Sequence, residues 1–343
     1  MADLADAARS GVAALRAAAA TEGLAVLADV IVGRPGPADE SGGGDGAAAF
    51  VFGPVDDAVA EIIGAASLTE EFLDRGRVPG SAGAQWEERF GFGRYAPLVE
   101  RAAKNALAGA GLDRADHVAV VSGNPAVAKR ASSLVAAAVG ATGSPIGYAG
   151  AATAGVALAD ALDRAQPGET ILLVSAADGA DALVLRATDR IADRRQRIPV
   201  AEQLATGRAV TYPTYLTWRG LLDREPPRRP EPDRVSGPAS SRSVDWKFGL
   251  TGSRCSKCSF VHLPPARVCK DCGAVDGMAP EALAGLPGTV ATYTVDRLAF
   301  SPAPPVVDAV VDFDDGGRYT FEVADADPAA LAVGCEWRPC SAG

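Results

Sequence analysis

Cysteine and histidine are scarce in most of this sequence. The chain has two histidines, His117 and His262, and the first of its six cysteines is Cys255. Catalysis by a thiol nucleophile needs a cysteine with a base beside it, commonly a histidine. Residues 1–254 contain no cysteine for this role, and no working acid–base pair is visible in them.

Basic charge and long apolar runs are also lacking. The net charge is −10, so the chain repels the phosphate backbone of a nucleic acid. No stretch reaches the roughly 18 apolar residues of a membrane span. The first 20 residues lack the basic start and unbroken apolar run of a signal peptide. We expect a cytoplasmic protein with no nucleic-acid or membrane partner.

Small apolar residues are abundant instead. Of the 343 residues, 48% are hydrophobic and only 6% are aromatic, which favours close packing of helices on sheets. Short apolar runs alternate with helical patterns up to about Arg190, which predicts an α/β layered domain. The predicted helices are Leu4–Ala20, Arg94–Ala110, Ala126–Val139 and Ala151–Ala165. The predicted strands are Leu24–Val32, Ala47–Phe52, Val59–Ala66, Val118–Val121, Thr170–Ser175 and Ala182–Ala187, with Leu68–Asp74 a helix or a tight loop.

The pattern changes after Arg190. Proline and arginine are frequent from Asp193 to Asp245, which indicates an extended connector. Its large apolar side chains between Tyr212 and Leu222 predict that this part docks on a surface. Beyond Gly288, β-rich runs are joined by Asp-Gly and Gly-Gly turns, so the tail is predicted to be all-β.

Four cysteines between these parts have the spacing of a metal site. Cys255, Cys258, Cys269 and Cys272 form the pattern C-x2-C-x10-C-x2-C. Two such knuckles can close a tetrahedron around Zn²⁺, and four protein ligands leave no open position for substrate. We predict a structural zinc ribbon, with a redox dithiol pair as the alternative.

Charged and histidine residues around the cluster have predicted roles of their own. Lys257 and Lys270 lie inside the knuckles, and Arg254 and Arg267 just precede them, so their charge would offset the thiolates. His262 could replace a ligand, but four thiolates suffice, and we expect an ordinary loop histidine.

Two glycine-rich segments allow different interpretations. Gly42–Gly46 precedes a predicted strand, so it does not have the strand–glycine–helix order of a dinucleotide site. Gly147–Gly150 opens a helix of small residues, whose N-terminus could hold a phosphate or an oxyanion. The alternative is that the small residues let this helix cross the core closely.

Several segments resemble enzymes of the thiolase superfamily, in the branch of hydroxymethylglutaryl-CoA synthase and ketoacyl synthase. The matching segments before residue 190 are Gly44–Gly53, Thr69–Asp74, Trp86–Gly91, Gly147–Leu162 and Glu169–Ala182. Trp246–Val333 resembles the zinc-ribbon and OB-fold module that accompanies acyl-CoA thiolases and synthases. The implied fold is an incomplete thiolase-like layered αβα domain followed by a rubredoxin-like zinc ribbon and an OB-fold β-barrel.

The resemblance implies acyl-CoA chemistry through a cysteine thioester, yet the matching positions lack the catalytic residue types. Ala8 stands at the nucleophile position. Ser122–Pro125 occupies the place of the family's histidine, and Tyr148-Ala149 that of its asparagine. No catalytic residue is therefore predicted, and the cofactor-binding residues are unknown.

The resemblance also suggests that both ends depart from the family. Met1 falls just before the nucleophile segment, so either the start is misplaced or a partner chain supplies the missing surface. A closed OB barrel needs five strands. Because the residues after Val333 do not resemble a strand, we expect a frameshift or an early stop there.

The expected domains are 1–82 and 83–192 (parts of the two thiolase-like halves), 193–247 (the docked connector), 248–287 (the ribbon) and 288–343 (the barrel). The leading functional hypothesis is an acyl-CoA-handling scaffold or acyl-CoA-binding subunit without its own nucleophile. It would pair with itself as a homo-oligomer or with a thiolase-type partner. One alternative is an active condensing or cleaving acyltransferase whose chain is clipped. The other is a zinc-ribbon nucleic-acid binder, which the acidic charge disfavours.

Overall fold

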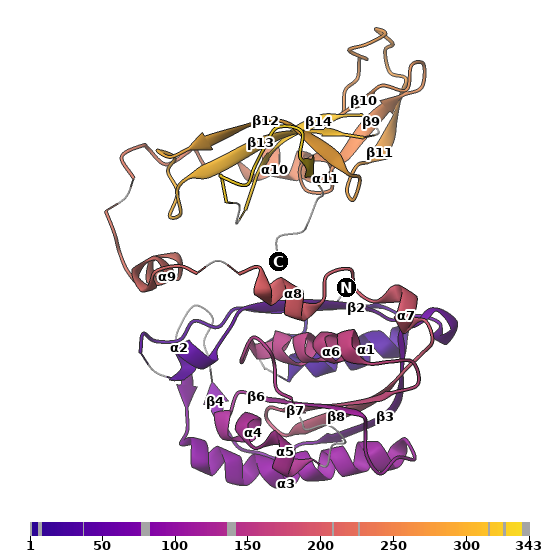
Figure 1. Ribbon diagram of the computed structural model, residues 1–343, viewed down its shortest axis with the longest axis vertical. Helices are drawn as coiled ribbons and strands as arrows, with labels where there is room; N and C mark the ends of the chain where they lie inside the picture. The colour runs from indigo at the N-terminus through magenta and orange to yellow at the C-terminus, as the bar shows by residue number, and fades with distance from the viewer. Residues whose placement is uncertain are drawn as a thin grey trace. The chain divides into compact units, whose positions relative to one another are not determined.

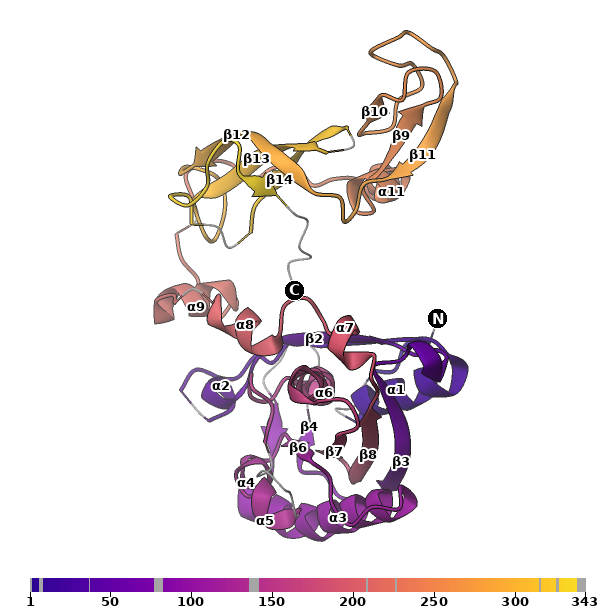
Figure 2. The ribbon, with the colours of Figure 1, turned by 45° about the vertical axis from the view of Figure 1, so that its right-hand side comes forward.

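The structure is a computed structural model that describes residues 2–5, 9–36, 38–76, 83–135, 142–207, 209–225, 227–314, 316–324 and 327–337. The chain divides into two compact units, Met1–Gly207 and Arg208–Gly343. Each unit has its own sheets and core (Figures 1 and 2).

The first unit is built in alternating layers. Helix α3 covers one face of a four-stranded sheet of order β3-β8-β7-β6, and helices α1 and α6 cover the other face (Figure 1). A two-stranded sheet, β1-β2, lies on the far side of these two helices. The bounds are α3 Glu88–Gly109, α1 Ser10–Thr21, α6 Thr153–Arg164, β3 Ala60–Leu68, β6 His117–Ser122, β7 Thr170–Ala176, β8 Ala180–Ala187, β1 Leu24–Asp29 and β2 Gly46–Val51.

The central sheet is apolar on both faces because helices cover both. Every residue of β7 is buried, and in β8 only Arg186 is exposed. Along β7, Leu172 and Val174 join the core beneath α3, whereas Ile171 and Leu173 join the core beneath α1 and α6. Because successive side chains of a strand point to opposite faces, this one apolar run contributes to two separate cores.

Small residues let α1 and α6 approach their neighbours closely. A Cβ atom on Gly11 would lie 2.0 Å from the carbonyl oxygen of Ala151, and one on Gly155 would lie 2.9 Å from Cβ of Ala48. Real side chains do not tolerate such distances. The prediction that small residues allow a close crossing of the core is therefore confirmed for α6.

Several predicted elements are shorter, longer or divided. The first helix begins at Ser10, not Leu4, and α3 begins at Glu88, ahead of the predicted Arg94. The predicted helix Ala126–Val139 is wrong as one element: it is split at Arg130 into α4 and α5, and residues 136–141 lie outside the described part. The remaining short elements of this unit are α2 Ala38–Gly42, η1 Val55–Asp57, β4 Arg75–Gly76, β5 Ala84–Gln85, α4 Pro125–Lys129, α5 Ala131–Leu134, η2 Gly150–Ala152, α7 Ile191–Arg194 and α8 Val200–Ala205.

The stretch after Arg190 is not the extended chain that its composition suggests. Helices α7 and α8 belong to the first unit, and the Arg195 guanidinium donates to the carbonyls of Leu162 and Asp163 at the C-terminal end of α6. The Asp163 carboxylate accepts the backbone N–H of Val200 at 2.8 Å. A cation at the last carbonyls of a helix is favourable, so this segment is anchored to α6.

In the second unit, three short helices precede two small sheets. They are α9 Tyr212–Trp218, α10 Gly237–Arg242 and α11 Val244–Lys247. The indole N–H of Trp218 donates to the Pro302 carbonyl at 3.2 Å, so α9 touches the loop after β12, although no residue of α9 is buried. The sheets have the orders β10-β9-β11 and β14-β13-β12-β15. Their strands are β9 Thr251–Cys255, β10 Val261–His262, β11 Met278–Ala282, β12 Gly288–Asp296, β13 Val306–Phe313, β14 Arg318–Glu322 and β15 Glu336–Trp337.

These two sheets share one hydrophobic core. Val261 of β10 and Leu263, just after it, are buried together with Leu283 and with Phe313 of β13. The second sheet is antiparallel throughout and curls in the manner of an OB fold. The expected fold class, an α/β layered domain followed by a zinc ribbon and an OB-type barrel, is confirmed.

The end of the chain contains a strand that sequence reasoning did not predict. Residues Glu336 and Trp337 form β15, which pairs with Gly288 and Thr289 of β12. The Trp337 ring stacks on Phe321, with 4.6 Å between the ring centroids. Tertiary packing of one aromatic residue thus makes a strand from residues without a β pattern, and the expectation that the tail after Val333 is not strand-like is wrong.

Among the described residues, no helix combines the length and apolar character needed to cross a membrane.

Candidate functional site

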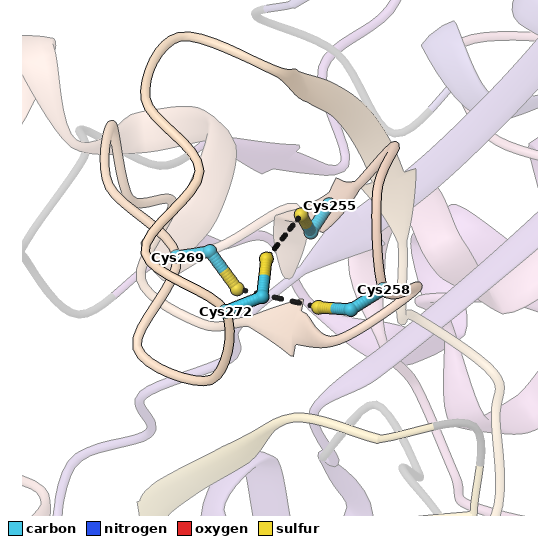
Figure 3. Close-up of side chains that lie close together, drawn as sticks. All are labelled: Cys255, Cys258, Cys269 and Cys272. Carbon is cyan, nitrogen blue, oxygen red and sulfur yellow. Dashed lines mark hydrogen bonds between the residues drawn. The ribbon is translucent and has the colours of Figure 1, made fainter.

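The four cysteines of the predicted zinc ribbon lie together in the second unit. Cys255 ends β9, Cys258 follows in the first knuckle, and Cys269 and Cys272 belong to the second knuckle (Figure 3). All four sulfur atoms lie within 4.8 Å of one another. The Cys255 and Cys272 sulfurs are 3.7 Å apart, and those of Cys258 and Cys269 are 3.5 Å apart.

This spacing fits a tetrahedral ion. A Zn–S bond of about 2.3 Å places two ligand sulfurs of a tetrahedron about 3.8 Å apart. The backbone N–H groups of Cys258 and Lys257 donate to the Cys255 sulfur and, as the main cause, lower the pKa of that thiol to about 7. The knuckle N–H groups therefore favour the thiolate form of Cys255. The opposite shift of the Cys258 pKa belongs to the same group of interacting sulfurs without an ion, and the geometry of the four sulfurs is what fits zinc.

The arginines beside the cluster pair with carboxylates. Arg254 forms an ion pair with Glu281 at 2.8 Å, and Arg267 pairs with Asp276 at 2.5 Å. Each pair ties one knuckle to the strand or turn that follows it. The offset of the thiolate charge by these side chains stays a prediction.

His262 also differs from its predicted role. It lies in β10, not in a loop, and is only 3% exposed. Its ring lies against Phe260, with 4.8 Å between the ring centroids. Burial, followed by the charge of Lys270, lowers the pKa of this imidazole. A neutral histidine therefore fills part of the core beside the ribbon.

The N-terminus of α6, a predicted candidate for anion binding, is occupied by the protein's own groups. The Asp29 carboxylate accepts the N–H of Ala151 at 3.0 Å, and the Thr153 hydroxyl accepts the N–H of Ala149 at 2.8 Å. Gly150 has a φ of +52°, and a Cβ there would lie 1.9 Å from an Asp29 oxygen. Asp29 takes the place at which a phosphate would bind.

The segment at the family's histidine position has a structural task. Asn124 is buried, and its Oδ1 atom accepts the N–H of Ala126 at 3.0 Å, so it caps helix α4. Its Nδ2 donates to the carbonyl of Glu88 at 3.0 Å. The Ser122 hydroxyl donates to the Ala176 carbonyl at 2.9 Å. These polar groups are all engaged with the chain itself.

The space next to this segment is filled. Tyr148, at the family's asparagine position, packs over Gly123, whose Cβ, if present, would lie 2.9 Å from the tyrosine ring. The cavity lined by Ser122, Gly123, Tyr148 and Ser175 has a volume of about 10 Å³. That is room for about one water molecule, whereas ligand pockets measure about 300–1,000 Å³.

A group of buried and half-buried acidic side chains near this position was not predicted from the sequence. Burial raises the pKa of Asp74, against the opposing charge of Arg75 and a hydrogen bond from Asn124. Burial also raises the pKa values of Tyr95 and Asp178. These residues are far apart in the sequence, and no local pattern marks them.

Arg9 links the start of α1 to the central sheet. Its guanidinium donates to the Asp181 carboxylate at 2.7 Å and to the hydroxyls of Thr69 and Ser67 at 2.7 and 2.8 Å. An open cavity of about 750 Å³ lies beside it, lined by Arg9, Arg16, Ser67 and Asp181 among others. Ala8, the predicted substitute for the family's nucleophile, lies outside the described residues.

Two domain families match the second unit. Residues 249–276 match the rubredoxin-like zinc ribbon domain of ChsH2, and residues 281–340 match the C-terminal OB-fold domain of ChsH2. A scaffold protein of Methanothermobacter thermautotrophicus that contains a DUF35 domain is 29% identical over 98 residues, which are 28% of this chain and 73% of that protein.

Longer matches to whole enzymes decide the family. The hydroxymethylglutaryl-CoA synthase of Methanosphaera stadtmanae is 31% identical over 246 residues, 64% of this chain and 69% of that enzyme. The chain belongs to the hydroxymethylglutaryl-CoA synthase family. The synthase of M. thermautotrophicus is 34% identical over 213 residues, 58% of this chain, and the match spans 61% of that enzyme.

This hydroxymethylglutaryl-CoA synthase family member thus combines a thiolase-like part with a ChsH2-type ribbon and OB fold. The resemblance seen in the sequence is confirmed. His117, the remaining histidine, starts β6, and its Nε2 atom lies 2.8 Å from the Glu169 carboxylate.

Proposed function

We propose that this chain is an acyl-CoA-handling subunit of the hydroxymethylglutaryl-CoA synthase type that has no nucleophile of its own. It acts as a scaffold for a thiolase-type enzyme, and its zinc is structural. The observation that carries the proposal is the filled site: Asn124 serves as a helix cap, and Tyr148 closes the space over Gly123. The absence of cysteine from residues 1–254 supports the same conclusion.

The similarity of the second unit to scaffold proteins supports the scaffold role. That unit resembles proteins described as DUF35 domain-containing scaffold proteins in two methanogens, at 29% identity in each case. Its four cysteines fill all positions of a tetrahedral ion, so zinc would stabilise the unit without touching a substrate.

We propose that acyl-CoA binds outside the filled site. The cavity beside α1 has a volume of about 750 Å³, which lies in the range of ligand pockets. Arg16, with a side chain 46% exposed and 3.6 Å from Asp181, offers a cation for the phosphates of coenzyme A. We assign acyl-CoA binding to this cavity.

An acyl-trapping experiment tests the lack of a nucleophile. The full chain is incubated with radiolabelled acetyl-CoA, quenched with acid and measured for bound label and intact mass. A catalytic hydroxymethylglutaryl-CoA synthase is treated in parallel. We expect label on the control enzyme only. A stoichiometric, hydroxylamine-sensitive adduct on this chain would instead support an active acyltransferase.

Two binding measurements test the proposed acyl-CoA site and the scaffold role. Equilibrium dialysis with acetyl-CoA should show binding that Arg16→Glu weakens about tenfold, whereas Arg101→Glu, an exposed charge on α3, leaves it unchanged. Gel filtration with a thiolase from the same organism should show one complex. Separate elution of the two proteins at micromolar concentration would contradict the scaffold role.

A further inference from the structure

A proline-rich segment, residues 223–236, leads from α9 to α10. The described part of this segment contains no helix or strand. Every described side chain in it is exposed except Pro227, which is half-buried. No residue of the segment belongs to the zinc site or to the proposed acyl-CoA cavity. Its unusual composition is therefore not explained by either of those sites.

Proline restricts the backbone of this segment. The prolines occupy positions 226, 227, 230 and 232. Each proline fixes its own φ at about −65°, and a residue that precedes a proline is restricted to extended conformations. Between the first and the last of these prolines, only Arg228 has neither restriction. The sequence is thus biased towards a polyproline II helix before any partner binds, which reduces the entropy lost on binding.

One edge of such a helix carries a recognition pattern. A polyproline II helix has about three residues per turn, so Arg224, Pro227 and Pro230 lie on the same edge. They form the pattern R-x-x-P-x-x-P, a cation followed by two prolines one turn apart. Prolines spaced in this way dock in grooves lined by aromatic side chains. A guanidinium at one end adds a strong hydrogen-bonded pair with a carboxylate.

A second edge is suited to water. It carries charges that alternate in sign at every third residue: Glu225, Arg228, Glu231 and Arg234. A helix with one edge of mixed charges and another of two prolines and a cation can lie on a partner by the proline edge. A spacer between two units needs prolines for stiffness, but it does not need a cation in register with them.

The free chain is not straight at this point. It bends at Arg228 and Arg229, and Arg229 forms an ion pair with Asp296 at 2.8 Å. The two side chains of this pair are 54% and 30% exposed. An exposed ion pair contributes little to stability, so a partner can straighten the segment at small cost.

We propose that Arg224, Pro227 and Pro230 form a docking motif for a partner protein. The partner has a groove of parallel aromatic side chains with carboxylates at one end. The prolines fill the groove, and Arg224 pairs with the carboxylates. This inference goes beyond the proposed function, because the contact needs neither acyl-CoA nor the thiolase-type enzyme. Acyl trapping does not depend on it, so the two proposals fail separately.

Isothermal titration of the full chain with an SH3 domain tests the proposal. The domain used is one that binds R-x-x-P-x-x-P peptides in its aromatic groove. We expect binding at a ratio of one to one. Arg224→Glu should weaken this binding at least tenfold, and so should the double variant Pro227→Ala, Pro230→Ala. Circular dichroism and zinc content of both variants should match those of the unmodified chain, because the segment lies outside the buried cores.

Two matched controls change the same residue types off the proline edge. Arg234→Glu makes the same charge change at an exposed position, and Pro232→Ala removes a proline that is not in register with the motif. Both variants should bind the domain within twofold of the unmodified chain. The proposal is overturned if the full chain does not bind the domain, or if Arg224→Glu and Arg234→Glu weaken binding equally. It is also overturned if the double proline variant binds as the unmodified chain does, because the segment would then be a charged spacer.

Discussion

Asn124 accepts the backbone N–H of Ala126 through its side-chain oxygen at 3.0 Å, where the family resemblance places a histidine. The same side chain donates to the Glu88 carbonyl, so it joins α4 to the start of α3. A residue with this task cannot easily be exchanged for a base. The polar group at this position therefore stabilises the fold by linking two helices.

Replacing this cap should cost stability. We expect Asn124→Ala to lower the free energy of unfolding by about 1–2 kcal/mol, because the cap and a buried hydrogen bond are lost. Asn124→Ser should lose less, since serine also caps helices. Urea denaturation followed by circular dichroism measures both. An Asn124→His variant that transfers acyl groups would contradict the proposed non-catalytic role.

Stability should depend on pH through Asp74. Burial raises its folded pKa above the unfolded value, so the unfolded state releases its proton first as pH rises. Asp74 therefore lowers stability increasingly above its ordinary pKa of 3.8. We expect the Asp74→Asn variant to be more stable than the unmodified chain at pH 7 but not at pH 3.5. Thermal unfolding at both pH values checks this, and an equal effect at both would refute the assignment.

The ion pair of Arg9 and Asp181 should contribute strongly to the free energy of unfolding. Asp181 is 5% exposed, and Arg9→Ala would leave its carboxylate buried with only Arg16 nearby. We expect a loss of about 3 kcal/mol, partly recovered in the double variant Arg9→Ala, Asp181→Ala. Arg164→Ala, which breaks the i,i+4 pair with Asp160, should cost about 0.5 kcal/mol or less. Chemical denaturation measures the free energy of unfolding of all three variants. Equal losses of stability in Arg9→Ala and Arg164→Ala would contradict a strong contribution from the buried pair.

One zinc ion per chain is expected. Cys258→Ser should abolish zinc binding, measured by mass spectrometry of the metal, whereas Cys335→Ser should retain it. Because Trp246 and Trp337 pack against the core shared by the ribbon and the barrel, metal loss should red-shift their fluorescence. An unshifted spectrum in the metal-free chain would show that the core does not need the ion.

The parts of the fold that depend on local pattern were predictable. The apolar run Thr170–Ser175 becomes β7, and the cysteine spacing brings four sulfurs together. Both the apolar run and the cysteine spacing depend only on residues that are close together in the sequence.

Other parts depend on contacts between distant residues. The early start of α3 was missed because Gly91, Gly93 and Pro97 weaken its helical pattern. Gly91 is needed there because a Cβ would lie 2.2 Å from an Asp74 oxygen. The strand at Trp337 and the buried Asp74 likewise arise from tertiary packing, which no local pattern records.

Because the ribbon and the barrel share one core, the stability of the barrel depends on zinc binding to the ribbon. Val261 of the ribbon and Phe313 of the barrel are buried in the same cluster, so an ion held by the ribbon stabilises both. By mass action, each tenfold rise in free zinc above the dissociation constant adds about 1.4 kcal/mol to the folded state. The abundance of the folded subunit in a cell would then follow metal availability, and zinc starvation would remove the whole second unit and not the ribbon alone.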